Sequence, residues 1–103
     1  MTKIVLVCGA GMSTSLLVTK MEQAAAQHEG IYEIIAVPGS GLKGVVEDAD
    51  VLLLGPQISF RKKEYAKTYE PNNVIVDVID SLDYGMMNGE KVFNHAINLL
   101  KNK

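Results

Sequence analysis

Short apolar runs alternate with segments of helical periodicity along the chain. Four of these runs are rich in Val, Ile and Leu, as strands covered on both faces usually are. The predicted strands span residues 3–7, 31–37, 51–54 and 74–79. Glu33 and Asp77 are the only acidic residues within them. The pattern therefore predicts four mostly buried strands.

The segments between the strands repeat apolar residues at the spacing of amphipathic helices. The first predicted helix opens at Ser13 or Thr14, which are suitable cap residues, and stops at Gly30. The other predicted helices span residues 42–47, 59–69 and 89–101. In the helix over 59–69, Phe60 is among the expected inward residues and Pro71 ends the pattern.

Alternation of this kind favours an α/β fold. We expect a single-domain four-stranded parallel sheet with right-handed crossovers and helices on both faces. Ligands of such sheets bind beyond the carboxyl ends of the strands, near the point where the strand order reverses. The segments that leave those ends are residues 8–15, 38–41, 55–57 and 80–89. The functional site is expected among them.

The composition of the chain excludes several classes of function. The chain has 103 residues, 48% of them apolar and 21% charged, with a formal net charge of −2. These values indicate one globular domain over residues 1–103, and without a basic run we expect no nucleic-acid partner. A single cysteine excludes an internal disulfide, and no metal-ligand spacing is present, so we expect no metal and no cofactor. Because no apolar run reaches bilayer length and no cleavage pattern is present, we expect a cytoplasmic protein. Because no exposed apolar stripe demands self-association, we expect a monomer.

Cys8 ends the first apolar run and opens a stretch rich in glycine and hydroxyl residues. Backbone amides in such a loop, together with the positive end of the following helix, favour a thiolate and can hold a phosphoryl group. Cys8 is therefore the candidate nucleophile. The candidate phosphate-binding residues are Gly9, Ala10, Gly11, Met12, Ser13, Thr14 and Ser15. The alternative interpretation is structural, with a buried thiol beside a tight glycine turn and ordinary helix caps.

Thr14 separates two kinds of cysteine chemistry. A cysteine-dependent tyrosine phosphatase has a loop of the form Cys-x5-Arg, in which the arginine clamps the phosphate. Thr14 occupies the arginine position here, Arg61 is the only arginine, and no Asp-Pro pair follows a strand as a general acid. A loop of amides and hydroxyls would hold a thiophosphate and hydrolyse it slowly. The pattern thus favours a phosphate carrier; a low-molecular-weight phosphatase-like hydrolase or a noncatalytic phosphate-binding module is the alternative.

Three motifs occur in register, CGAGMSTSLL at residues 8–17, LLGPQI at 53–58 and VIDSLDYG at 78–85. Together they resemble the IIB components of the bacterial sugar phosphotransferase system (PTS), of the lactose, cellobiose and chitobiose type. The resemblance covers essentially the whole chain, and residues 9–15 match the family's phosphate loop.

The resemblance also implies a mechanism and partners. A phosphohistidine on a IIA protein would donate its phosphoryl group to Cys8, giving a phosphocysteine. Cys8 would then transfer the group to a β-linked disaccharide, similar to cellobiose or chitobiose, that enters through the membrane permease IIC. IIC would recruit the protein to the inner face of the membrane.

Three residues near other strand ends are candidates for supporting the site. Gln57 could donate a hydrogen bond toward the loop, although the role of a turn residue fits it as well. Asp80 would repel a phosphorylated cysteine, so we expect it to cap backbone amides. Tyr84 could gate the site. His28 and His95 fall on predicted helices away from the loop, and we assign them no role.

Overall fold

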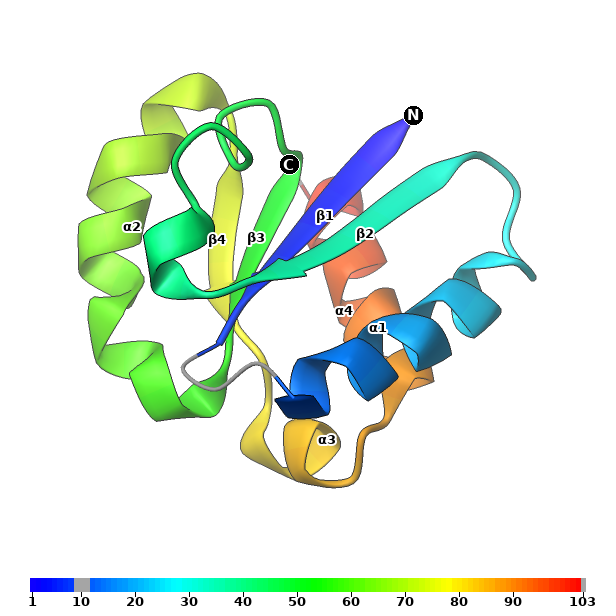
Figure 1. Ribbon diagram of the computed structural model, residues 1–103. Coiled ribbons are helices and arrows are strands. Elements are labelled where there is room, and N and C mark those ends of the chain that lie inside the picture. The colour runs from blue at the N-terminus through cyan, green and yellow to red at the C-terminus, as the bar shows by residue number, and fades with distance from the viewer. Residues whose placement is uncertain (9–11, 103) are drawn as a thin grey trace.

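The centre of the computed structural model is a four-stranded parallel sheet in the order β2-β1-β3-β4 (Figure 1). The structure describes residues 1–8 and 12–102, with the backbone alone described at 12–14. The strands are β1 Thr2–Val7, β2 Tyr32–Val37, β3 Val51–Leu54 and β4 Ile75–Val78. The predicted α/β class, the parallel sheet and all four strands are confirmed, and no strand end shifts by more than one residue.

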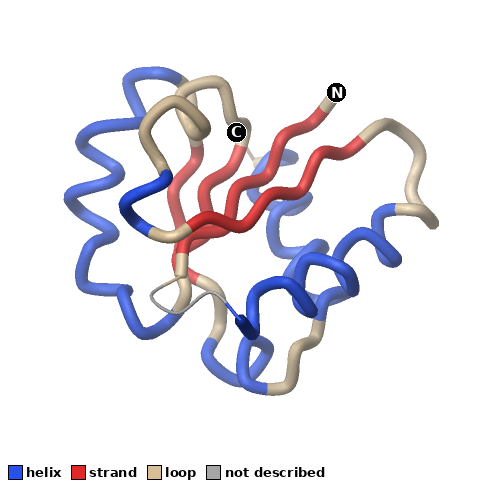
Figure 2. Tube along the Cα trace, in the orientation of Figure 1, coloured by secondary structure: helices blue, strands red, loops and turns tan. Residues whose placement is uncertain are grey.

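Helices cover both faces of this sheet (Figures 1 and 2). α1 Met12–Ala25 and α4 Gly89–Lys101 lie on one face, and α2 Lys62–Tyr69 lies on the other. α3 Ser81–Gly85 is a short helix beyond the carboxyl end of β4 (Figure 1). Short 3-10 helices lie in the connections at Gly39–Gly41, Pro56–Arg61 and Glu70–Asn72.

The strands send alternate side chains to the two faces, which divides the core into two layers. In the layer under α1 and α4, Leu6 belongs to one buried cluster with Leu17 and Phe93. In the layer under α2, Val7 belongs to a second cluster with Tyr65. Leu6 and Val7 are both fully buried, so β1 is covered on both sides, as its unbroken apolar run predicts.

The helix predicted over residues 42–47 is wrong. These residues form turns, and Gly44 among them has a φ of +89°, which a right-handed helix cannot contain. The side chains of Leu42 and Val46 are nevertheless buried in the core layer under α2. The helical spacing of these two apolar residues therefore reflects their burial and not a helix.

The helix predicted over residues 59–69 is divided in two. A 3-10 helix runs to Arg61, with a non-helical bend at Ile58, and α2 begins only at Lys62. Because the bend and the tighter turn change the rotation of side chains about the axis, Phe60 is 79% exposed and not inward. α2 does end before Pro71, as predicted.

The first helix is shorter than the prediction. α1 begins at Met12, so Ser13 and Thr14 lie in its first turn. It ends at Ala25, and turns carry the chain to Gly30, whose φ is +108°. α4 has the predicted bounds, whereas α3 was not predicted.

The order of the strands sets the position of the site. β1 leads to β2 on one side, and the chain then returns past β1 to place β3 on its other side. The direction of winding therefore reverses between β1 and β3. Cys8 follows β1 and Gly55 follows β3, so both residues lie at the switch point where ligands of such sheets bind.

Candidate active site around Cys8

Cys8 lies one residue beyond the end of β1 and is 2% exposed. Its backbone N–H donates to the carbonyl oxygen of Val37 at the end of β2, with an N–O distance of 3.4 Å. Its side chain belongs to the core layer under α1 and α4, the same layer as Leu6. The sheet therefore fixes the backbone of Cys8 and directs its sulfur toward the side from which α3 and α1 approach.

Gly55 lies directly beside the Cys8 sulfur. Its N–H donates to the carbonyl oxygen of Val7 at 2.8 Å, which holds the ends of β3 and β1 together. A Cβ atom at Gly55 would lie 3.2 Å from the Cys8 Sγ and 2.8 Å from the Gln57 Oε1. Glycine therefore allows a close approach here, and an added Cβ would require Gln57 and the Cys8 sulfur to shift. The sequence analysis missed this role. A glycine immediately after a buried strand is the signal that could have revealed it.

Gln57 and Cys8 thus flank the same face of Gly55. Gln57 is exposed, so its amide lies at the surface next to the enclosed sulfur. The structure brings this predicted supporting residue to the site.

Tyr84 contributes from α3 and is 7% exposed. Its side chain belongs to the same buried cluster as Cys8. The helix that carries it begins at Asp80, whose Oδ2 accepts hydrogen bonds from the backbone N–H groups of Leu82 and Asp83, both at 3.1 Å. The capping role expected for Asp80 is therefore observed, on the amides of a short helix.

Burial raises the pKa of the Cys8 thiol, because the charged thiolate loses hydration. Hydrogen bonds with the Tyr84 side chain and with the backbone of Gly55 act in the opposite direction, and the net shift of the pKa is upward. Any group that donates to this sulfur consequently has a large influence on how much thiolate is present.

The predicted phosphate loop falls largely outside the described residues. Gly9, Ala10 and Gly11 are not described, and Met12, Ser13 and Thr14 are described only as backbone at the start of α1. Ser15 is exposed and belongs to the first turn of α1. α1 begins four residues after Cys8, as expected of a helix that opens at this loop.

Arg61 and His28 have contacts away from Cys8. Arg61 pairs with Glu64 at 3.0 Å and lies over the ring of Tyr65, 4.9 Å from its centroid. His28 packs edge-on against Phe93, with ring centroids 4.9 Å apart. The sequence analysis assigned His28 no role, and this packing contact agrees with that.

His95 pairs with Asp77, the acidic residue of β4, with 2.9 Å between Nε2 and Oδ2. Lys62 from α2 contacts the other oxygen of Asp77 at 3.2 Å. Burial alone would raise the pKa of Asp77, but hydrogen bonds from the Val78 N–H, His95 and Lys62 hold that pKa below its usual value. Asp77 therefore joins β4 to a helix on each face of the sheet.

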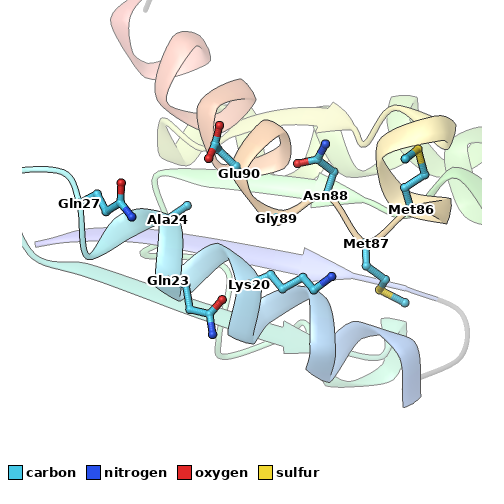
Figure 3. Close-up of a pocket in the computed structure, with 9 residues that line it drawn as sticks. All are labelled: Lys20, Gln23, Ala24, Gln27, Met86, Met87, Asn88, Gly89 and Glu90. Atoms are coloured by element: carbon cyan, nitrogen blue, oxygen red, sulfur yellow. The ribbon is translucent and has the colours of Figure 1, made fainter.

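An open groove lies between α1 and the connection from α3 to α4, with a volume of about 400 Å³ (Figure 3). Its lining residues are Lys20, Gln23, Ala24, Gln27, Met86, Met87, Asn88, Gly89 and Glu90. Cys8 is not among them. At one side of this groove Gly89 touches the backbone of α1, since a Cβ there would lie 2.5 Å from the Lys20 carbonyl carbon. The groove therefore lies where the start of α4 packs against α1, and it is separate from Cys8.

No group of His, Cys, Asp and Glu side chains within residues 1–8 and 12–102 could hold a metal ion. Within the same residues no helix is both long and apolar enough to cross a membrane.

Comparison with known proteins gives a consistent result. Residues 3–95 match the family model described as "PTS system, Lactose/Cellobiose specific IIB subunit". The chain is 49% identical over 102 residues to a galactose-specific EIIB component of the PTS from Lactococcus lactis subsp. cremoris, which covers 94% of each chain. It is 45% identical over 103 residues to an oligo-beta-mannoside-specific EIIB component from Bacillus subtilis, covering all of both chains.

A solved structure agrees in fold. The solution structure of a cellobiose-specific phosphotransferase IIB component from Borrelia burgdorferi superposes with a TM-score of 0.79 and 44% sequence identity. The match covers 99% of this chain and 94% of that one.

Proposed function

The chain belongs to the lactose/cellobiose family of PTS IIB components, and from this premise we propose that Cys8 is its phosphoryl acceptor. IIB components are phosphotransferases that work with IIA and IIC partners. The observation that carries the assignment to Cys8 is its position at the switch point between β1 and β3, with its sulfur close to Gly55.

The proposed cycle has two transfers. In the first, the Cys8 thiolate attacks the phosphorus of a phosphohistidine on IIA, so that an S–P bond forms and the P–N bond breaks with its electron pair returning to the histidine. In the second, a sugar hydroxyl attacks the same phosphorus, the S–P bond breaks with its electron pair returning to Sγ, and the hydroxyl proton leaves to solvent or a nearby base. Cys8 is thus nucleophile first and leaving group second.

Residues 9–15 are proposed to hold the equatorial phosphate oxygens through backbone amides and the hydroxyls of Ser13, Thr14 and Ser15. The start of α1 at Met12, within this segment, supports the proposal, because helix N-termini favour anions. Gln57 is proposed to donate its amide toward the same phosphate from the opposite side, given its contact with the Gly55 position beside Sγ.

Retention of the phosphate, rather than hydrolysis, is proposed from two observations. Thr14 stands where a phosphatase loop has its arginine. Arg61, the only arginine, is engaged with Glu64 and Tyr65. Without a guanidinium clamp at the phosphate, attack by water lacks the charge stabilisation that such enzymes use.

We further propose a β-linked disaccharide as the final acceptor. The names of the matched proteins include cellobiose and oligo-beta-mannoside, which are β-linked sugars, and also galactose. The protein is proposed to work as a cytoplasmic monomer that IIC brings to the inner face of the membrane, and no nucleic acid is proposed as a partner.

Reconstitution tests the function. The full chain is mixed with phosphoenolpyruvate, the general phosphotransfer proteins, a IIA partner and membranes that contain IIC, and formation of sugar phosphate is measured for cellobiose, a β-mannobiose and galactose. Formation that depends on this chain and disappears in Cys8→Ser supports the proposal. Sustained hydrolysis of a chromogenic phosphate ester by the chain alone would instead identify a phosphatase.

A further inference from the structure

Phe60 is 79% exposed, and a run of basic residues, Arg61, Lys62 and Lys63, follows it directly along the chain. We propose that Phe60, together with Lys63 and Lys67 of α2, forms a contact surface for the anionic lipid headgroups of a bilayer. These three residues are called the Phe60 patch below. The inference goes beyond the proposed function, in which IIC alone brings the chain to the membrane.

The three side chains of the Phe60 patch lie on the outer side of one continuous segment. Lys63 and Lys67 are one turn apart in α2, and both are exposed. Phe60 precedes Lys63 by three residues, in the last turn of the 3-10 helix Pro56–Arg61, and residues at this spacing lie above one another in such a turn. The inner side of α2 carries Tyr65, which is 5% exposed in the core layer under this helix. The patch therefore faces away from the sheet.

The positive charge of the Phe60 patch is not neutralised within the described structure. The ion pairs described above occupy Arg61 and Lys62, whereas Lys63 and Lys67 form no ion pair with any residue that the structure describes. Glu70, the remaining acidic residue of this segment, follows the end of α2. Because the whole chain has a formal net charge of −2, the attraction of this surface for anions is local.

The kinds of residue in the patch favour a lipid surface over a protein as the occupant. Protein interfaces are depleted in lysine, and their centres contain several apolar side chains packed together. Among residues 32–81, all of which the structure describes, Phe60 is the only large apolar side chain that is exposed. A single aromatic ring at the level of the headgroups, flanked by lysines, is instead typical of contact with an anionic membrane surface.

The patch lies near the same edge of the sheet as the candidate active site (Figure 1). The 3-10 helix that carries Phe60 begins at Pro56, directly after Gly55, which lies beside the Cys8 sulfur. A bilayer contact at Phe60 would therefore turn the carboxyl edge of the sheet toward the membrane. One ring and two lysines bind a membrane weakly and reversibly, so the contact orients the chain and does not anchor it.

The chain contains no tryptophan, so a tryptophan placed in the patch gives a direct measurement of lipid contact. Phe60→Trp is the reporter, and Ile31→Trp, at an apolar position that is 72% exposed before β2, is the matched control. Each full chain is titrated at low ionic strength with vesicles of phosphatidylcholine alone, or of phosphatidylcholine and phosphatidylglycerol in equal parts. The emission of Phe60→Trp should shift to the blue with the anionic vesicles only, and that of Ile31→Trp should not shift.

Paired charge variants test the role of the lysines by sedimentation with the anionic vesicles. Lys63→Gln/Lys67→Gln should weaken binding about 25-fold, since each lysine near an anionic surface contributes about fivefold. Lys20→Gln/Lys91→Gln has the same net charge but changes exposed residues of α1 and α4, so it should weaken binding by less than about twofold. Phe60→Ala should weaken binding about tenfold, because its ring no longer leaves water.

Three results would overturn the inference: no blue shift of Phe60→Trp with anionic vesicles, an equal shift with neutral vesicles, or equal binding by the two double lysine variants. A chain that binds no vesicle, but whose Phe60→Ala variant fails to form sugar phosphate with IIC membranes, would identify a protein as the occupant and would also refute the lipid contact.

Phosphorylation of Cys8 by IIA needs no bilayer, so it tests the proposed function separately. A chain that IIA phosphorylates but that binds no anionic vesicle would refute the lipid contact and leave the proposed function standing. A chain that binds anionic vesicles through the Phe60 patch, but that IIA never phosphorylates, would support the lipid contact and refute the proposed function.

Discussion

Gly89→Ala is the substitution whose cost the structure predicts most directly. Gly89 is buried where α4 begins against α1, and an added Cβ would lie 2.5 Å from the Lys20 carbonyl carbon and 2.6 Å from the Met21 nitrogen. Both atoms are backbone, so no change of side-chain rotamer can relieve the overlap. α4 or α1 would have to shift as a whole.

The expected loss follows from that overlap. Insertion of a methyl group into a closely packed contact costs about 1–3 kcal/mol, and a backbone clash should place this variant in the upper half of that range. A loss of about 2 kcal/mol should lower the midpoint of thermal unfolding by roughly 8–16 °C in a domain of this size. Part of the clash energy is offset because alanine favours helices more than glycine does, by about 1 kcal/mol at most.

Gly85→Ala is the matched control. Gly85 is also a glycine at a helix position, in α3, but nothing lies within 4 Å of an added Cβ. We expect this variant to be as stable as the wild type or slightly more stable. Urea and thermal unfolding followed by circular dichroism compare the two variants, and a Gly89→Ala protein as stable as Gly85→Ala would refute the close packing of α1 on α4.

Three further substitutions test other contacts. Gly55→Ala should slow phosphorylation of Cys8 by IIA, measured in single-turnover reactions, because its Cβ would lie 3.2 Å from Sγ and displace Gln57; a wild-type rate would contradict the close approach. Because the folded-state pKa of Asp77 is lowered, its stabilising effect is present above the unfolded pKa of about 4 and is lost as the pH falls through the folded pKa. Asp77→Asn should therefore be less stable than the wild type at neutral pH in urea unfolding, with the gap closing in acid, and a gap independent of pH would count against the ion pairs. Phe60→Ala should change stability by less than about 0.5 kcal/mol, since the ring is 79% exposed, whereas a loss typical of a core phenylalanine would show that the ring is inward.

The sheet could be predicted because each of its strands is a distinct apolar run in the sequence. Unbroken Val, Ile and Leu runs indicate strands covered on both faces, and all four runs became parallel strands. α4 could be predicted equally well, because apolar residues recur on one face through its whole length. Alternation along the chain then placed Cys8 at the carboxyl edge of the sheet.

The errors in the predicted helices have local causes that the spacing of apolar residues does not show. Residues 42–47 bury Leu42 and Val46 at helical spacing, but the positive φ of Gly44 prevents a helix. The bend at Ile58 rotates Phe60 out of the position that a continuous helix would give it. α3 is too short for any periodicity, although Asp80 is a recognisable cap residue in its sequence.

The site was predicted in part. The structure places Cys8 and Gln57 on the same side of Gly55, while their roles in the site stay predictions. The cap by Asp80 was expected on the grounds of charge and is observed. The burial of Tyr84 in the cluster that contains Cys8, and the close approach at Gly55, depend on how β3 and α3 meet the end of β1. Such distances between remote segments leave no pattern in a single sequence. The phosphate-binding role of residues 9–15 stays a prediction.

Mapping of the phosphoryl group is the measurement that tests the central claim most directly. The full chain is incubated with phosphoenolpyruvate, the general phosphotransfer proteins and IIA, its intact mass is recorded, and the modified residue is identified by peptide sequencing under conditions that preserve thiophosphates. The account predicts one phosphoryl group on Cys8, absent when IIA is omitted and absent in Cys8→Ser. A phosphoryl group on any other residue, or a Cys8→Ser protein that IIA still labels, would contradict it.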